Sequence, residues 1–143
     1  MYQITNRIID INFNIPVENL EKAYKAMRTA DVVLSRDGSA MRKVILSVWS
    51  RREQKNILKG AKNAADVFNK LGFTTEFDLH GNLSVVGYKD ITSFADVDST
   101  LRAVASYVEA GSRIKWMNSE GDRWTEIFDG KKMNITDEII VSY

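Results

Sequence analysis

The sequence of 143 residues contains no cysteine, one proline and one histidine, and each scarcity excludes a class of chemistry. Without cysteine the chain forms no disulfide, no thiolate nucleophile and no thiolate-ligated metal site. The single histidine, His80, precedes Gly81 in an expected turn. A catalytic triad or a histidine-based zinc site needs companions that this position lacks. We therefore predict no catalytic residues and no metal site.

Long apolar runs are also missing. No segment approaches the ~18 consecutive apolar residues of a membrane-spanning helix. Near the N-terminus, Asn6, Arg7 and Asp10 interrupt any apolar core of the kind that a signal peptide requires. No glycine-rich phosphate-binding motif is present, so we expect no nucleotide cofactor. These absences predict a cytoplasmic protein that makes no membrane contact.

The composition is that of an ordinary globular domain. Hydrophobic residues make up 44% of the chain and charged residues 27%, with a formal net charge of +1. A chain of this length fits one domain with one hydrophobic core, and no linker or internal repeat interrupts it. We therefore predict a single domain over residues 1–143.

Charge is distributed unevenly along this nearly neutral chain. Residues 36–70 hold nine basic side chains and three acids, whereas the remainder is acidic. The asymmetry predicts an electrically polarised molecule, which favours association with a charged partner. The basic residues of this segment are Arg36, Arg42, Lys43, Arg51, Arg52, Lys55, Lys59, Lys62 and Lys70.

The first half of the chain begins with a strand pattern and continues with helical patterns. Residues 7–15 alternate, with Ile9, Ile11, Phe13 and Ile15 expected on one side of a strand. After Pro16, apolar residues recur at helical spacing, which predicts a helix over 17–28. The buried stripe of this helix comprises Val17, Leu20, Tyr24 and Met27.

In the middle of the chain, the sequence pattern fits more than one type of secondary structure. Residues 29–38 fit either a helix extension or a short strand. Residues 39–50 fit a helix better than a strand, although β-branched residues keep the strand alternative open. Helical spacing continues to Leu71, with Gly72 as the expected cap. A helix over 39–71 is unusually long, so we expect a break near Ser50 or Gly60.

Hairpins dominate the second half. Residues 74–88 alternate around a turn at His80, Gly81 and Asn82. A helix is expected from Ser93 towards Gly111, and a hairpin from Gly111 to Gly130 around an Asn-Ser-Glu-Gly-Asp turn. A strand is expected over 139–143. Successive hairpins predict an α+β fold, an antiparallel sheet with helices packed on one face in a two-layer sandwich.

The sharpest candidate for a binding site is a basic stripe. Arg52, Lys55, Lys59 and Lys62 recur at i, i+3, i+7 and i+10, so a helix would place them on one side, and Arg51 could extend the patch. Such a row suits a phosphate backbone or an acidic protein surface. The plain alternative is a solvated helix face. No aromatic residues interleave with the stripe, so base stacking is not supported.

The hairpin near the C-terminus offers a second, weaker candidate for partner binding. It comprises Trp116, Glu120, Asp122 and Trp124. Aromatic residues at strand alternation more often fill a core than a cofactor cage, but an exposed tryptophan would be an interface anchor. The acids Glu120, Asp122, Glu126 and Asp129 fit no calcium-loop spacing, and turn chemistry accounts for the first two.

The run from Gly111 to Gly130 resembles the C-terminal segment of small proteins of unknown function encoded by tailed phages and prophages. The shared elements are a Gly-Ser pair before a strand with Ile and Trp, an acid–Gly–acid turn, a second Trp and a final Phe-Asp-Gly. The run over 72–88 is similar to their preceding hairpin. The resemblance covers the last half of the chain, outside the basic stripe, and transfers no catalytic residue. It implies a phage accessory protein in the cytoplasm of the host cell.

Three hypotheses follow. The first is a non-enzymatic phage protein that binds and inhibits a host protein or nucleoprotein, such as a CRISPR effector, or that binds a nucleotide signal; the sequence does not choose between them. The second is a direct nucleic-acid-binding protein that uses the basic stripe. The third is an enzyme with a carboxylate site near Glu120, Asp122 and Glu126. The sequence does not set the oligomeric state.

Overall fold

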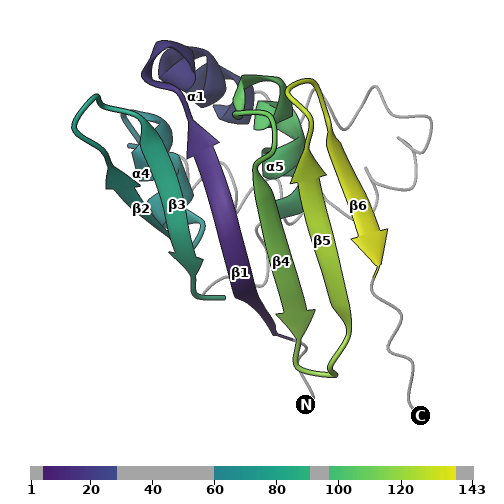
Figure 1. The fold of residues 1–143 in the computed structure, drawn as a ribbon. Coiled ribbons are helices and arrows are strands. Elements are labelled where there is room, and N and C mark those ends of the chain that lie inside the picture. Colours follow the sequence, from purple (N-terminus) through teal and green to yellow (C-terminus); the bar gives the residue numbers. More distant parts are fainter. Residues whose placement is uncertain (1–4, 29–59, 91–96, 138–143) are drawn as a thin grey trace, which may run out of the picture.

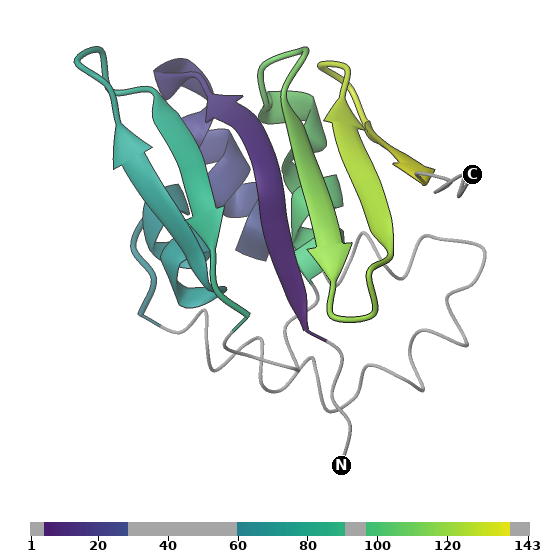
Figure 2. The same cartoon turned by 60° about the horizontal axis from the view of Figure 1, so that its bottom comes forward.

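The computed structural model describes residues 5–28, 60–90 and 97–137. The described strands form one antiparallel sheet of six strands in the order β2-β3-β1-β4-β5-β6. The described helices lie behind one face of this sheet, and the two views in Figures 1 and 2 agree on this arrangement. The predicted fold class, α+β with helices on one face of an antiparallel sheet, is confirmed.

The central strand, β1 (Asn6–Ile15), pairs with β3 (Leu83–Tyr88) on one side and β4 (Arg113–Asn118) on the other. The strand itself was predicted, but the inward position of Ile9 was wrong. The register shifts between Ile8 and Asp10, so Ile8 packs towards the core and Ile9 is exposed. A bulge inserts one residue into a strand and so reverses the alternation beyond it.

The first helix begins as a single 3-10 turn, η1 (Val17–Asn19), and continues as α1 (Leu20–Arg28). Pro16 precedes it, and Glu18 and Glu21 lie near the positive end of the helix dipole. Met27 is buried as expected, together with Ala23, whereas Val17 is exposed. The helix contacts both α4 and α5.

The next described helix, α4 (Ala64–Lys70), is short. Asn63 caps its N-terminus by accepting a hydrogen bond from the backbone N–H of Asp66 at 2.9 Å. Gly60 lies in a turn with φ +89°, so the expected break at that residue is present. The prediction of a helix that continues through Lys62 was therefore wrong, because Lys62 lies in the segment before α4. Residues 39–50 fall outside the described ranges.

The first hairpin joins β2 (Phe73–Phe77) to β3, as expected, and β2 is an edge strand of the described sheet. The turn between these strands spans residues 78–82, which is longer than the expected turn at His80, Gly81 and Asn82. The carboxylate of Asp78 accepts hydrogen bonds from the backbone N–H groups of His80 and Asn82. This Asx geometry takes Leu79 out of the strand and leaves it fully exposed at the tip.

The last third contains α5 (Val97–Val104), a 3-10 turn η2 (Ala105–Tyr107), β4, β5 (Arg123–Phe128) and β6 (Met133–Asp137). The β4–β5 hairpin was predicted. The strand β6 was missed: Asp129–Lys132 was interpreted as a turn, and the short alternation of Met133 and Ile135 with polar residues was not assigned to a strand. The strand expected over 139–143 lies outside the described residues.

The core lies between the sheet and the helices. Phe13 of β1 packs edge-on against Phe68 of α4 at 5.9 Å and against Phe128 of β5 at 5.1 Å between ring centroids. Trp116 of β4 joins this cluster through Phe73 and Tyr88. Edge-to-face packing suits aromatic rings and joins the two halves of the sheet to one helix layer. No described helix is long and apolar enough to cross a membrane.

Candidate functional site

The face of the sheet opposite the helices carries basic side chains from three neighbouring strands. Side chains alternate between the two faces of a strand, and the buried Ile114 and Trp116 of β4 point towards the helices. Figure 1 looks onto the opposite face. We call this the outer sheet face, and its basic residues are Arg7 in β1, Arg113 and Lys115 in β4, and Arg123 in β5.

The strand register brings these four residues together. Arg7 and Arg123 both pair with Met117, from its two sides, which places their Cα atoms about 10 Å apart. Arg113 and Lys115 are two residues apart on β4, a distance of about 7 Å along the strand. The four cations therefore form one cluster on this face.

The only acid that faces outward from the described β1, β4 and β5 is Asp10. Its Oδ2 lies 3.6 Å from Nη2 of Arg113, and both side chains are about half exposed. An exposed pair of this kind contributes little to stability. Among the outward residues of these three described strands, four cations therefore accompany one acid. These outward residues include no aromatic side chain, so the face lacks a platform for base stacking.

The predicted basic stripe is only partly within the described structure. Arg51, Arg52, Lys55 and Lys59 lie outside the described residues. Lys62 is exposed, and its backbone N–H donates to Oδ2 of Asp66 at 3.0 Å. Since Lys62 lies before α4 rather than on a helix, helical spacing from Lys59 does not extend to it.

The weaker hairpin candidate divides between core and surface. Glu120 and Asp122 are exposed in the β4–β5 turn, where Oδ1 of Asn118 accepts hydrogen bonds from both of their backbone N–H groups. Trp116 is only 3% exposed and belongs to the core, so it offers no surface to a partner. Trp124 is partly buried and stacks on Trp116, with 6.3 Å between ring centroids.

A buried glutamate is the most unusual polar feature of the described core. Glu126 of β5 is 0% exposed, and its Oε1 accepts a hydrogen bond from the indole N–H of Trp116. Burial raises the pKa of Glu126 to about 8, and the negative charge of Asp98 in α5 acts in the same direction. Its second oxygen, Oε2, accepts no hydrogen bond from a described residue, and a hydrogen bond with the carboxyl group of Asp98 raises the pKa further. At neutral pH this side chain is mostly a neutral carboxylic acid.

The acids of this hairpin do not converge on a common site. Glu126 points into the core, whereas Asp122 lies in the turn before β5 and Asp129 in the turn after it. Oδ1 of Asp129 accepts hydrogen bonds from the backbone N–H groups of Lys131 and Lys132, which lower its pKa. Among the described residues, no group of three or more His, Asp or Glu side chains is placed to hold a metal ion.

The outer sheet face was missed at the level of the sequence. Arg113 and Lys115 do alternate with Ile114 and Trp116, which is a readable strand pattern. Nothing in the sequence, however, indicates that β1 pairs with β4. That long-range pairing adds Arg7 to the group, and only the fold supplies it.

Comparison of the chain with protein-family models, with curated proteins and with solved structures finds no significant match.

Proposed function

We propose that this protein is a non-enzymatic phage accessory protein that binds and inhibits a host macromolecule, a defence nucleoprotein of the CRISPR type. The resemblance of the Gly111–Gly130 run to phage-encoded proteins supports the phage context. The outer sheet face supports binding, because it presents clustered cations on a rigid sheet. A nucleoprotein offers phosphates and acidic side chains to such a surface.

The observation that carries this proposal is the convergence of Arg7, Arg113, Lys115 and Arg123 on one face. Surface charges of one sign steer association with an oppositely charged partner and fix its orientation. A sheet holds these positions without the ordering cost that a flexible loop incurs on binding. The buried Glu126 belongs to a different part of the molecule, enclosed between sheet and helices and closed to a substrate.

The test is an interference assay combined with affinity capture. Bacteria with an active CRISPR system reject a targeted plasmid, and expression of this chain is expected to restore its transformation. The tagged protein should also retain a stoichiometric nucleoprotein from the same cells. The double variant Arg7→Glu/Arg123→Glu is expected to lose both effects, since two of the four cations are replaced by acids.

The matched control is Lys22→Glu/Lys70→Glu, which makes the same change of charge on the exposed side of α1 and α4. It should behave as the unmodified protein. Circular dichroism checks that each variant is folded. Equal loss of inhibition in both double variants would indicate a general charge effect and would contradict a role for the outer sheet face.

A second candidate function is direct binding of duplex nucleic acid by the same cations. The two-residue spacing of Arg113 and Lys115 favours it, because it suits contacts with neighbouring phosphates. Affinity for a short DNA duplex should then fall steeply with salt, and Arg7→Glu/Arg123→Glu should flatten that dependence. Charge reversal at Lys55 and Lys59 tests the basic stripe in the same assay. Undetectable binding at 50 mM salt would eliminate this candidate.

A further inference from the structure

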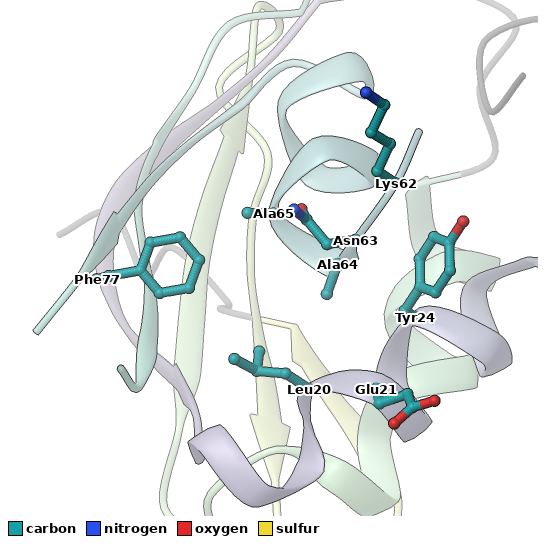
Figure 3. Close-up of a pocket in the computed structure, with 8 residues that line it drawn as sticks. All are labelled: Leu20, Glu21, Tyr24, Lys62, Asn63, Ala64, Ala65 and Phe77. Carbon is teal, nitrogen blue, oxygen red and sulfur yellow. The ribbon is translucent and has the colours of Figure 1, made fainter. Parts of the chain in front are cut away.

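A small apolar cavity opens between α1, α4 and the end of β2, on the helix side of the molecule. It has a volume of about 240 Å³ and is lined chiefly by Leu20, Tyr24, Ala64, Ala65 and Phe77. Figure 3 shows Phe77 and Leu20 facing this space, with the charged ends of Glu21 and Lys62 pointing away from it. An open cavity with apolar walls favours an apolar guest.

The apolar surface continues beyond the cavity to the tip of the β2–β3 hairpin. Phe77 is 56% exposed, and Leu79 and Val17 are also exposed. Val17 lies against this tip, because its backbone N–H donates to Oδ1 of Asn82 at 2.8 Å. Contiguous exposed apolar side chains on a globular protein mark an interaction site more often than scattered ones do.

A second, acidic hollow lies at the same end of the sheet as the apolar cavity. It is lined by Asn14, Pro16, Glu18, Asp78, Asn82 and Glu109, and has a volume of about 540 Å³. The same two chain segments line both hollows. In the first segment, Phe77 lines the apolar cavity and Asp78 lines the acidic hollow. In the second, Leu20 lines the apolar cavity and Glu18 lines the acidic hollow. The side-chain amide of Asn82 lowers the pKa of Asp78, which keeps this carboxylate charged.

We propose that this corner binds a segment of a partner protein in which a bulky apolar side chain neighbours a lysine or arginine. The apolar side chain enters the cavity beside Phe77, and the cation lies among Glu18, Asp78 and Glu109. Charge complementarity selects this partner, because the lining of the second hollow contains three carboxylates and no cation. The lining of the two hollows includes none of Arg7, Arg113, Lys115 and Arg123, and the acidic hollow would take the opposite charge to those cations.

The probes are fluorescein-labelled octapeptides with a central Phe-Arg or Leu-Lys pair. Matched peptides replace the apolar residue by Ser or the basic residue by Glu. Fluorescence anisotropy should show saturable binding of the first set and at least tenfold weaker binding of both replacements. In methyl and aromatic NMR spectra, the perturbed signals should be those of Leu20, Ala65 and Phe77.

Two variants and two controls locate the site. Phe77→Ala and Glu18→Lys should each weaken peptide binding at least fivefold. Ile135→Ala removes a 41% exposed apolar side chain from the opposite edge strand, and Asp137→Lys reverses an exposed acid of the same strand. Neither control should change the affinity.

Three results would overturn the proposal. They are binding of the Ser or Glu peptides with the same affinity as the original peptides, NMR perturbations elsewhere, and a dimer in sedimentation that Phe77→Ala dissociates. The last result would assign the corner to a second copy of this chain instead. Because none of these variants touches Arg7 or Arg123, failure here leaves the function proposed for the outer sheet face intact.

Discussion

At the scale of single residues, the pair of Trp116 and Glu126 determines how stability depends on pH. The indole N–H satisfies one carboxyl oxygen, while burial disfavours the charged form of the acid. A raised folded-state pKa means that the native protein binds a proton more tightly than the unfolded chain does. The stabilisation is therefore complete below about pH 4.5 and is lost as pH rises towards about 8.

We predict that Glu126→Gln stabilises the protein at neutral pH. The amide keeps the shape and the acceptor for Trp116 but needs no proton. Because one pH unit corresponds to about 1.4 kcal/mol, the free energy of unfolding should rise by about 3 kcal/mol at pH 7. Thermal unfolding between pH 4.5 and 8 provides the measurement.

The gain of the Glu126→Gln variant should shrink towards zero at the acid end of the range. Glu120→Gln is the control, since the exposed Glu120 side chain lies in a turn and its replacement should leave the pH profile unchanged. A Glu126→Gln variant that is less stable than the unmodified protein at every pH would refute the assignment of a buried neutral acid.

At the scale of elements, α4 shows how local sequence sets helix ends. Asn63 satisfies the N–H of Asp66 at the N-terminus, and Gly72 follows the C-terminal Leu71 with φ +107°. The left-handed conformation satisfies the last carbonyl groups of the helix and suits glycine. This end directs the chain from α4 into the outer strand β2.

We predict that Gly72→Ala lowers the free energy of unfolding by about 1–2 kcal/mol, because a Cβ atom is strained in the left-handed region. Gly87→Ala is the matched comparison. Gly87 is not among the glycines with positive φ, and an added Cβ would meet Thr74 at an ordinary 3.7 Å. Urea unfolding of both variants measures the difference, and equal losses would contradict the backbone explanation.

At the scale of the whole molecule, the outer sheet face and the corner beside Phe77 differ in charge rather than in packing. The outer sheet face has one acid, Asp10, among its central cations, whereas the corner beside Phe77 is acidic. Exposed ion pairs contribute little to folding but do shape the electrostatic field that a partner meets. The charge of the outer sheet face should therefore be adjustable at almost no cost in stability.

We predict that Asp10→Asn changes the free energy of unfolding by less than about 1 kcal/mol, yet increases retention on heparin. Removing this acid also frees Arg113 for an anionic partner. Elution at increasing salt gives the order, with Asp10→Asn eluting later and Arg7→Glu/Arg123→Glu earlier than the unmodified protein. Identical elution of all three would show that this face does not control the binding of polyanions.

Features that depend on neighbouring residues were predictable from the sequence, whereas features that depend on long-range strand pairing were not. Turns, caps and hairpins depend on neighbouring residues, so Gly72, the β4–β5 hairpin and the fold class were predictable. The bulge in β1 was not, because it depends on the register of Ile8 and Ile11 against Trp116 and Ile114. The strand β6 was overlooked although Met133 and Ile135 alternate with Asn134 and Thr136, because a short edge strand in which only Met133 is buried gives a weak signal.

The sequence by itself determined the chemistry that is available: no thiol, a lone histidine, abundant lysine and arginine, and aromatic residues at strand spacing. Tertiary structure alone decided where that chemistry lies. It placed Arg7 of β1 beside Arg113, Lys115 and Arg123 of the β4–β5 hairpin. The physical reason is that strand pairing joins residues about a hundred positions apart, and no local pattern encodes that pairing.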